Sequence, residues 1–351
     1  MVKTIKIGNR IIGEGEPCYF IAEAGVNHNG SVDLAKDLIK TAAKARADAV
    51  KFQKRSISDL LIAEVLAWPY GGPNSLGKTY GEHRAKLELT EDDYWQLSRY
   101  AKECGITFLA SVWDKPSADF IDSLGVPAFK IPSADLTNLP LLEHVARKGK
   151  PVILSTGMST LEEVREAVDL ILRYNEKLVL LHCISVYPCD AHEVNLRVME
   201  TLKREFGVLV GYSGHEKTGF AVTEAAVALG AVVVERHFTL DRTMPGPDHA
   251  ASLDAFGLER LIVHIREDVE AALGSPEKTI TEKEWAVRGR LAKSIVSTRD
   301  IKAGEILQPE MLTVKGPGTG LKPKNLADLY GKVAQCDISA DTLVPVEALD
   351  W

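Results

Sequence analysis

The sequence predicts a (β/α)8 barrel, the TIM-barrel fold of the α/β class, followed by a small β-rich domain. Three observations lead to this prediction. Eight short β-rich runs occur between residues 17 and 273, amphipathic helical segments separate them, and the composition changes near Gly274. The runs are apolar almost throughout, which is typical of parallel strands covered on both faces, and eight such units favour a closed barrel over an open sheet.

The predicted strands and helices alternate along the chain. Helical periodicity marks residues 31–46 and 160–174, and the second segment opens with Ser159-Thr-Leu-Glu-Glu, a capping sequence with first-turn acids. A long insertion, residues 54–90, follows the second strand, and loops of that length in a compact domain are usually functional. The eight predicted strands are residues 18–22, 49–52, 107–110, 128–131, 152–154, 178–181, 208–211 and 232–234.

We expect two domains joined by a linker. The prediction is a TIM-barrel catalytic domain over residues 1–274, a polar linker over 275–290 and a β-rich domain over 291–351. The last domain has short strand-like runs and glycine turns. Because so short a segment buries little core by itself, we expect the barrel or a second subunit to stabilise it.

Composition disfavours several classes of function. With 45% hydrophobic and 26% charged residues the chain is typical of a globular protein. Its net charge of -7 disfavours a nucleic-acid partner or an anionic membrane surface. The sequence has neither a signal-peptide pattern nor an apolar run of about 18 residues, and its cysteines lack CxxC spacing. We therefore expect reduced thiols and a cytoplasmic location.

Two histidines end neighbouring predicted strands. The segment Gly211-Tyr-Ser-Gly-His215 is followed about twenty residues later by Val234-Glu-Arg-His237. In a parallel barrel the carboxyl ends of the strands form the catalytic face. His215 and His237 are therefore predicted to project into one site that suits a divalent metal. The alternative is that each is a hydrogen-bonded residue of the barrel rim.

Two lysines and several hydroxyls also follow predicted strands. Lys51 and Lys130 supply positive charge and the hydroxyls supply directional hydrogen bonds, a combination suited to a phosphate and a carboxylate. The alternatives are solvated surface lysines or a Schiff-base lysine. Glu23, after the first strand, is a candidate general acid or base, or a partner of one lysine. The hydroxyls belong to Ser111, Ser133, Ser155, Ser185 and Ser213.

Seven motifs occur in order along the chain. They are Ile21-Ala-Glu-Ala-Gly-Val-Asn-His-Asn-Gly30, Val50-Lys-Phe-Gln53, Phe129-Lys-Ile-Pro-Ser133, Leu154-Ser-Thr-Gly-Met158, Leu181-His-Cys-Ile-Ser-Val-Tyr-Pro188, Gly211-Tyr-Ser-Gly-His215 and Glu235-Arg-His-Phe-Thr-Leu-Asp241. This set closely resembles the N-acetylneuraminate (sialic acid) synthase family. The tail, with Ile301-Lys-Ala-Gly304 and Gly331-Lys332, is similar to that family's antifreeze-like (SAF) domain. The resemblance covers essentially the whole chain.

The resemblance implies condensation of phosphoenolpyruvate (PEP) with N-acetylmannosamine or its 6-phosphate, with phosphate released by C–O cleavage. His215 and His237 would hold Mn²⁺, Mg²⁺ or Co²⁺, and Glu23 matches the proposed acid/base residue. The PEP-binding positions correspond to Lys51, Ser111, Lys130, Ser133, Ser155, Ser185 and Ser213. The sugar-contacting positions correspond to Gln53, Asp135, Tyr187 and Asp248.

The chain departs from the family pattern at several positions. Gly316 stands where many bacterial members carry an arginine that holds the N-acyl group, so that contact does not carry over. Asp135 and Ser185 are milder departures. The insertion resembles that of the animal enzymes, whose acceptor carries a 6-phosphate. Lys78, His83 and Arg84 are therefore candidate phosphate ligands, and the alternative is a loop latch. Candidate replacements for the missing arginine are Lys315, Lys322 and Lys324.

The resemblance also implies a domain-swapped homodimer in which each small domain covers the partner's barrel. Three rival functions stay open at this point. One is a related synthase making a legionaminic- or pseudaminic-type acid, and a second is a Schiff-base aldolase. The third, outside enzymes, is an ice- or ligand-binding protein.

Overall fold

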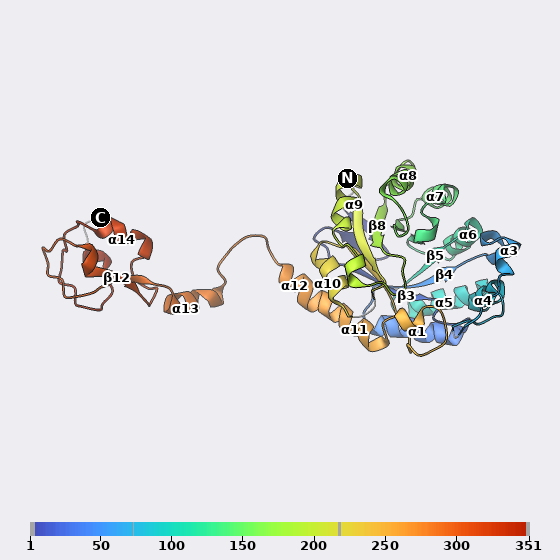
Figure 1. The fold of residues 1–351 in the computed structure, drawn as a ribbon, viewed down its shortest axis with the longest axis horizontal. Coiled ribbons are helices and arrows are strands. Elements are labelled where there is room, and N and C mark those ends of the chain that lie inside the picture. The colour runs from blue at the N-terminus through green and yellow to red at the C-terminus, as the bar shows by residue number, and fades with distance from the viewer. Residues whose placement is uncertain (1–3, 73, 217–218, 349–351) are drawn as a thin grey trace. The chain divides into compact units, whose positions relative to one another are not determined.

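In the computed structural model of the protein, residues 4–72, 74–216 and 219–348 are described. The chain divides into two compact units, Met1–Gly274 and Ser275–Trp351. The first unit contains a closed barrel of parallel strands in the order β10-β3-β4-β5-β6-β7-β8-β9 (Figure 1). The predicted (β/α)8 fold is therefore confirmed.

Each predicted barrel strand coincides with an observed one. Because β3 pairs with both β4 and β10, residue Glu23 lies opposite Lys51 on one side and His237 on the other. The closure of the barrel thus brings the first and last strand ends together. The strands are β3 (Tyr19–Gly25), β4 (Ala49–Lys54), β5 (Thr107–Val112), β6 (Phe129–Ile131), β7 (Val152–Ser155), β8 (Leu178–Cys183), β9 (Leu209–Gly214) and β10 (Val233–His237).

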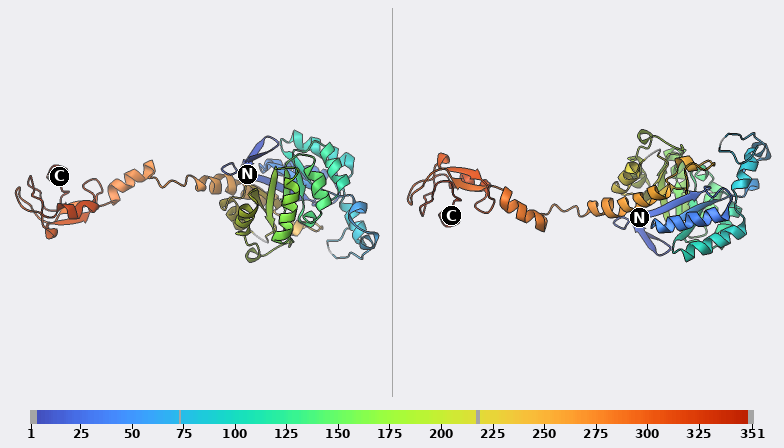
Figure 2. Two further views of the ribbon diagram at one scale, coloured as in Figure 1. Left: turned by 90° about the horizontal axis from the view of Figure 1, so that it is seen from above. Right: turned by 90° about the horizontal axis from the view of Figure 1, so that it is seen from below.

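Helices cover the outside of the barrel (Figures 1 and 2). Side-chain caps begin many of them, including Ser31 before the first and capping boxes at Thr90 and Thr160. Their apolar faces pack against the outward side chains of the strands. The helices are α1 (Val32–Lys44), α5 (Glu91–Glu103), α6 (Lys115–Ser123), α7 (Leu139–Ala146), α8 (Leu161–Leu172), α9 (Val198–Phe206), α10 (Ala221–Ala228), α11 (Ala255–Val263) and α12 (Glu270–Leu273).

An N-terminal hairpin closes the base of the barrel. Strands β1 (Thr4–Ile7) and β2 (Arg10–Gly13) pair antiparallel, and their buried isoleucines join the interior side chains from the amino-terminal ends of the barrel strands. The sequence prediction missed this hairpin. Alternating apolar residues around the two-residue loop Gly8–Asn9 were the available signal.

The described part of the predicted long insertion contains three short helices. They are α2 (Ile57–Leu60), α3 (Ala63–Leu66) and α4 (Tyr80–Leu87), and the last begins at the side-chain cap Thr79. The insertion follows β4, so it leaves the barrel at the carboxyl ends of the strands. It is therefore on the face where catalytic groups are expected.

The second unit has its own small core. Strands β11 (Ser294–Ser297) and β12 (Leu312–Lys315) pair antiparallel, and α14 (Leu326–Leu329) packs on them through Leu329. The predicted linker differs from the structure, because α13 (Glu282–Leu291), with a capping box at Thr281, occupies its second half. Within the described residues, no helix combines the length and apolarity needed to cross a membrane.

Candidate active site

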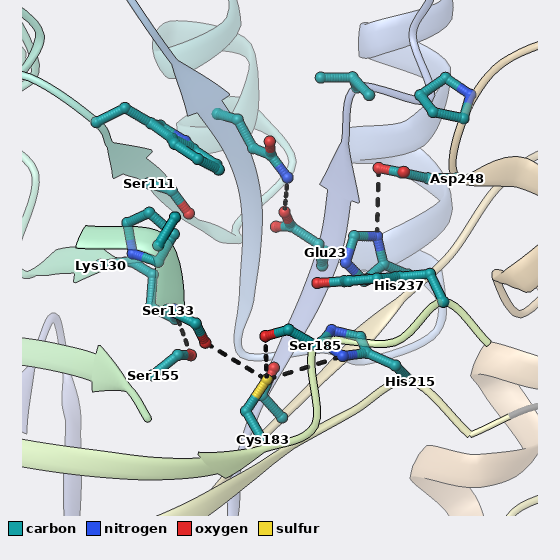
Figure 3. Close-up of a pocket in the computed structure, with 18 of the residues that line it drawn as sticks. Glu23, Ser111, Lys130, Ser133, Ser155, Cys183, Ser185, His215, His237 and Asp248 are labelled. Atoms are coloured by element: carbon teal, nitrogen blue, oxygen red, sulfur yellow. Dashed lines mark hydrogen bonds and ion pairs between the residues drawn. The ribbon is translucent and has the colours of Figure 1, made fainter. Parts of the chain in front are cut away.

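A cavity of about 270 Å³ opens at the carboxyl ends of the barrel strands. Nearly all predicted site residues line it, and the lining residues labelled in Figure 3 converge from several strands. The two exceptions are Lys78 and Asp135. The predicted residues that do line it are Glu23, Lys51, Gln53, His83, Arg84, Ser111, Lys130, Ser133, Ser155, Ser185, Tyr187, Ser213, His215, His237 and Asp248.

Lys51 lies at the centre of a buried charge cluster. Its ammonium is 2.6 Å from Glu23 Oε2 and 3.5 Å from Glu235 Oε1, and it donates to Ser111 Oγ at 2.7 Å. Lys51 is only 1% exposed, so it is not a solvated surface cation. Burial lowers its pKa, but the two carboxylates outweigh this effect and raise it overall.

The same cluster sets the protonation of Glu23. Burial and the Glu235 carboxylate raise the pKa of Glu23 to about 7, although the Lys51 ammonium opposes the shift. Gln53 Nε2 donates to Glu23 Oε1 at 2.7 Å and fixes the carboxyl group. Glu23 is therefore paired with Lys51, as the alternative interpretation held, and its raised pKa moves its titration toward neutral pH.

A second group of donors surrounds Lys130. Its ammonium donates to Ser155 Oγ at 2.7 Å and to the Ile131 carbonyl at 2.9 Å, and burial lowers its pKa. Ser133 Oγ accepts from the backbone N–H of Gly157 at 3.0 Å. A Cβ at residue 157 would lie 2.3 Å from Ser185 Oγ and 2.8 Å from Ser133 Oγ. The glycine thus leaves room for two hydroxyls to approach one point, as an anion cradle requires.

The histidine pair faces the same cavity. The ring centroids of His215 and His237 are 5.5 Å apart. His215 Nδ1 donates to the Ile184 carbonyl at 2.7 Å, which leaves Nε2 as the acceptor nitrogen. His237 Nδ1 is 3.8 Å from Asp248 Oδ2 and has no hydrogen-bond partner among the described residues. Both rings are buried, and burial holds the pKa of His237 well below its usual range.

Three predicted sugar-contacting residues gather beside the histidines. Tyr187 packs on the His215 ring with centroids 3.9 Å apart. A Cβ at Gly25 would lie 3.3 Å from Gln53 Nε2 and 3.4 Å from Asp248 Oδ2, so these groups converge on one point. Asp135, the fourth predicted residue, is outside the cavity lining. It lies in a short 3-10 turn, and its Oδ1 accepts from Asn138 at 3.0 Å.

The three candidate phosphate ligands of the insertion, Lys78, His83 and Arg84, have different surroundings. His83 is buried, accepts from the Leu76 N–H at 3.2 Å and packs on Tyr70 with centroids 4.6 Å apart. This bonding is that of a latch within the insertion. Arg84 lines the cavity and donates to Tyr80 Oη at 2.6 Å, whereas Lys78 lies outside the lining. Arg84 therefore places a guanidinium group in the cavity lining, whereas Lys78 contributes no charge there.

The sequence prediction missed several lining residues. Arg55 is 4% exposed, packs its guanidinium 4.1 Å from the Trp113 ring and forms an ion pair with Glu88, whose Oε1 is 3.6 Å from Nη1. Arg55 and Trp113 directly follow strands, which was the available signal. Glu235 was given no role in the sequence prediction, although it lies two residues before His237 on the same strand face. Cys183, which lies between Ser133 and His215, ends β8, and this position at a strand end was the available signal.

The fold and the site together define a class of protein. Active sites of TIM-barrel enzymes lie at the carboxyl ends of the strands, where this chain has two buried lysines, clustered hydroxyls and an imidazole pair. The protein is thus a barrel enzyme whose pocket suits a small anionic substrate. Its similarity to known proteins gives the family.

The chain belongs to the NeuB family. The NeuB family model matches residues 38–278, and the SAF domain model matches residues 292–349. Both matches confirm the resemblance predicted from the motifs.

The most similar relatives include enzymes with different named products. The chain is 42% identical over 343 residues to N-acetylneuraminate-9-phosphate synthase of Homo sapiens, a match that covers 97% of this chain and 95% of that protein. It is also 42% identical over 344 residues to N,N'-diacetyllegionaminic acid synthase of Legionella pneumophila, covering 96% of each.

A solved structure agrees with this assignment. The crystal structure of N-acetylneuraminic acid (sialic acid) synthetase from Leptospira borgpetersenii, in complex with citrate, is 32% identical to this chain. The match has a TM-score of 0.72 and covers 81% of this chain and 94% of that one. These three relatives are thus named as synthases of N-acetylneuraminic acid, its 9-phosphate or diacetyllegionaminic acid, and the solved one shares this fold over most of the chain.

Proposed function

We propose that the protein is a nonulosonate synthase that condenses PEP with N-acetylmannosamine or its 6-phosphate. The observation that carries this proposal is the convergence of two buried lysines, clustered hydroxyls and two imidazoles in one cavity. An acceptor of the legionaminic or pseudaminic type is the second candidate, because relatives named for those products also match the chain.

The lysines and hydroxyls would bind PEP. Lys51 and Lys130 are 1% and 2% exposed. Because water screens buried charges only weakly, both ammonium groups would attract an anion that enters the cavity. Ser133, Ser155 and Ser185 would donate directional hydrogen bonds to the phosphate and carboxylate oxygens. The bound anion would also offset the cost of burying two ammonium groups.

The chain's donor set fits a divalent cation. His215 is oriented by its backbone hydrogen bond, and His237, which lines the cavity, has no hydrogen-bond partner for its Nδ1 among the described residues. The described residues contain no cluster of three or more His, Cys, Asp or Glu side chains that could hold an ion. Two imidazoles would therefore supply the protein ligands. A bound Mn²⁺, Mg²⁺ or Co²⁺ would act as a Lewis acid toward the acceptor's aldehyde.

Glu23 would move the proton. In the proposed sequence the enol carbon attacks the aldehyde, water adds at the phosphate-bearing carbon, and C–O cleavage releases phosphate. The aldehyde oxygen must gain a proton and the water must lose one. A carboxyl group with a pKa of about 7 is suited to both transfers. Gln53 and Lys51 would keep it in place throughout.

The cavity wall also suits a second anion. Arg84 comes from the insertion and Arg55 from the end of β4, and both line the cavity. We propose that these two guanidinium groups bind the acceptor's 6-phosphate, with Arg55 replacing the Lys78 of the sequence prediction. Lys315, a candidate for the acyl contact, forms an ion pair with Asp341.

We also propose the domain-swapped homodimer. Helix α13 carries Trp285 and Leu291, which are 58% and 68% exposed, and association would cover such apolar side chains. Sedimentation velocity should give a dimer. A monomer at micromolar concentration with full activity would contradict this proposal.

Product mass spectrometry tests the function. The protein would be incubated with PEP and Mn²⁺ and with N-acetylmannosamine or its 6-phosphate, each offered separately. We expect one nonulosonate product and an equal amount of phosphate. Borohydride trapping of pyruvate on a lysine would support the Schiff-base aldolase instead, and ice-growth inhibition without PEP turnover would support the binding protein.

A further inference from the structure

A buried ion pair lies directly behind the two histidines. Glu216 follows His215 in the sequence, and Arg236 precedes His237. Side chains alternate along a strand, so His237 faces the cavity whereas Arg236 faces the layer between barrel and helices. Glu216 and Arg236 are each 2% exposed and form a hydrogen-bonded ion pair.

The ion pair belongs to a closed hydrogen-bond network. Thr223 of α10 accepts from Arg236 Nη1 at 2.7 Å and donates to Glu216 Oε1 at 2.6 Å. Tyr212 of β9 donates its hydroxyl to Glu216 Oε2 at 3.0 Å. Both carboxylate oxygens therefore accept hydrogen bonds, as a buried carboxylate requires. The network joins β9, β10 and α10 at one point.

Gly214 leaves the space that the network fills. A Cβ at this residue would lie 2.5 Å from Glu216 Oε2 and 2.8 Å from Arg236 Cδ. Gly214 is the last residue of β9 and directly precedes His215. The same short segment thus accommodates the ion pair and carries one imidazole into the cavity.

The network connects β9 and β10 through side chains at the point where their backbone hydrogen bonds end. The last residues paired along these strands are Gly214 and Arg236, so both histidines lie past the end of the ladder. Glu216 and Arg236 join the two segments one residue away from each imidazole. The separation of the rings, 5.5 Å between centroids, depends on how these segments are held.

We infer that Glu216 and Arg236 are positioning residues, whose ion pair, supported by Thr223 and Tyr212, holds His215 and His237 at the separation that a divalent cation requires. This inference rests on the metal site of the proposed function. It predicts a change in metal affinity, whereas an ion pair with only a structural role would change stability alone.

Asp48 offers a matched control. Its carboxylate is also buried, with a side chain 6% exposed, and pairs with Arg10 and Arg266. It accepts from the Phe20 N–H at 2.8 Å. Asp48 precedes β4, at the opposite end of the barrel from the histidines. Asp48→Asn therefore removes a comparable buried charge without touching the proposed metal site.

The test is a titration of the intact, substrate-free protein with Mn²⁺. Electron paramagnetic resonance measures the concentration of free Mn²⁺ and so gives the Kd. Glu216→Gln is expected to raise the Mn²⁺ Kd about 10- to 100-fold. Tyr212→Phe, which removes a single hydroxyl, should raise it by a smaller factor. Asp48→Asn should lower Tm, measured by calorimetry without metal, and leave the Mn²⁺ Kd unchanged.

Each outcome decides a separate point. An unchanged Mn²⁺ Kd in folded Glu216→Gln, or an equal increase in Asp48→Asn, would overturn the positioning role and leave the proposed function standing. If Glu216→Gln fails to fold, Tyr212→Phe decides by the same criterion. If the wild-type protein does not bind Mn²⁺, the metal site and the positioning role both fail.

Discussion

The two ends of the barrel interior use the same strands but opposite kinds of side chain. At the base, inward residues are apolar and the β1–β2 hairpin seals them. Two residues farther along the same strands, at the rim, the inward residues are charged or hydroxylated. The base and rim residues of five strands are Ile21 and Glu23, Ala49 and Lys51, Leu109 and Ser111, Ile153 and Ser155, and Val233 and Glu235.

We attribute stability to the apolar residues of the base and chemistry to the polar residues of the rim. Apolar burial at the base contributes to folding, because each such side chain leaves water without leaving a polar group unpaired. At the rim, burial lowers the pKa of Lys130 and raises that of Asp248, so the charged forms are held at a cost in free energy. A bound substrate anion would recover part of that cost for the lysines.

The largest effect is expected from removing a rim charge. Lys130→Met should lower kcat/KM for PEP by on the order of 10³-fold, because the anion loses a buried cation. The same variant should be at least as stable as the wild type, since a desolvated charge is replaced by an apolar chain. Phosphate-release kinetics and urea unfolding would measure the two quantities. A variant that loses both stability and activity would contradict the view that the rim serves chemistry and the base serves stability.

The opposite result is expected at the base. Ile12 is fully buried beneath the barrel, and Ile12→Ala should lower the free energy of unfolding by about 2–5 kcal/mol. Because Ile12 is remote from the cavity, kcat/KM should stay unchanged below the melting transition. Urea unfolding and phosphate-release assays on the same sample provide the comparison. A fall in kcat/KM without unfolding would show that the two ends are coupled.

The rim also contains a buried neutral imidazole. Burial lowers the pKa of His28 from its usual 6.5 to about 4. Between these values the unfolded chain binds more protons, so the free energy of unfolding should fall as the pH falls through this window, by on the order of 3 kcal/mol. Urea titrations over this range would compare the wild type with His28→Asn. An equally steep pH dependence in the variant would remove His28 as the cause.

Removal of the metal should lower catalytic activity, which depends on the residues of the rim. A chelator is expected to lower kcat by about 100-fold or more, and added Mn²⁺ should restore it. His237→Ala should not recover with Mn²⁺. Phosphate release measured across a Mn²⁺ titration would give both results. Full activity in the chelator-treated wild type would argue against metal chemistry.

The smallest effect is expected at the acceptor end of the cavity. Arg84→Ala should raise KM for N-acetylmannosamine 6-phosphate by on the order of tenfold and leave the unphosphorylated sugar unaffected. Lys78→Ala is the matched control, because Lys78 belongs to the same insertion but lies outside the cavity lining. Equal changes for both sugars would point to a fold effect and not to phosphate binding.

The sequence predicted the barrel because strand and helix periods are local signals. Once the strands were placed, their last residues and the rule for barrel active sites led to Lys51, Lys130, Ser155 and His237 without knowledge of their contacts. These residues lie on strands or at strand ends, where direction is fixed by the backbone.

The residues that were missed or misplaced depend on loops and tertiary contacts. Arg55 lines the cavity because its guanidinium packs on Trp113, a residue distant in sequence. Asp135 lies outside the cavity lining and accepts a hydrogen bond from Asn138, which caps the next helix. The Glu216–Arg236 network required the register of two strands and the position of a third element, none of which the sequence specifies locally.

The central claim is that the residues of the rim catalyse the condensation of PEP with the aldehyde of an amino sugar. The most direct measurement is mass spectrometry of the product formed from PEP, Mn²⁺ and N-acetylmannosamine or its 6-phosphate, with phosphate quantified in parallel. The account predicts a product that contains all carbons of both substrates, formed in equal amount with phosphate. Release of pyruvate without a combined product would contradict it.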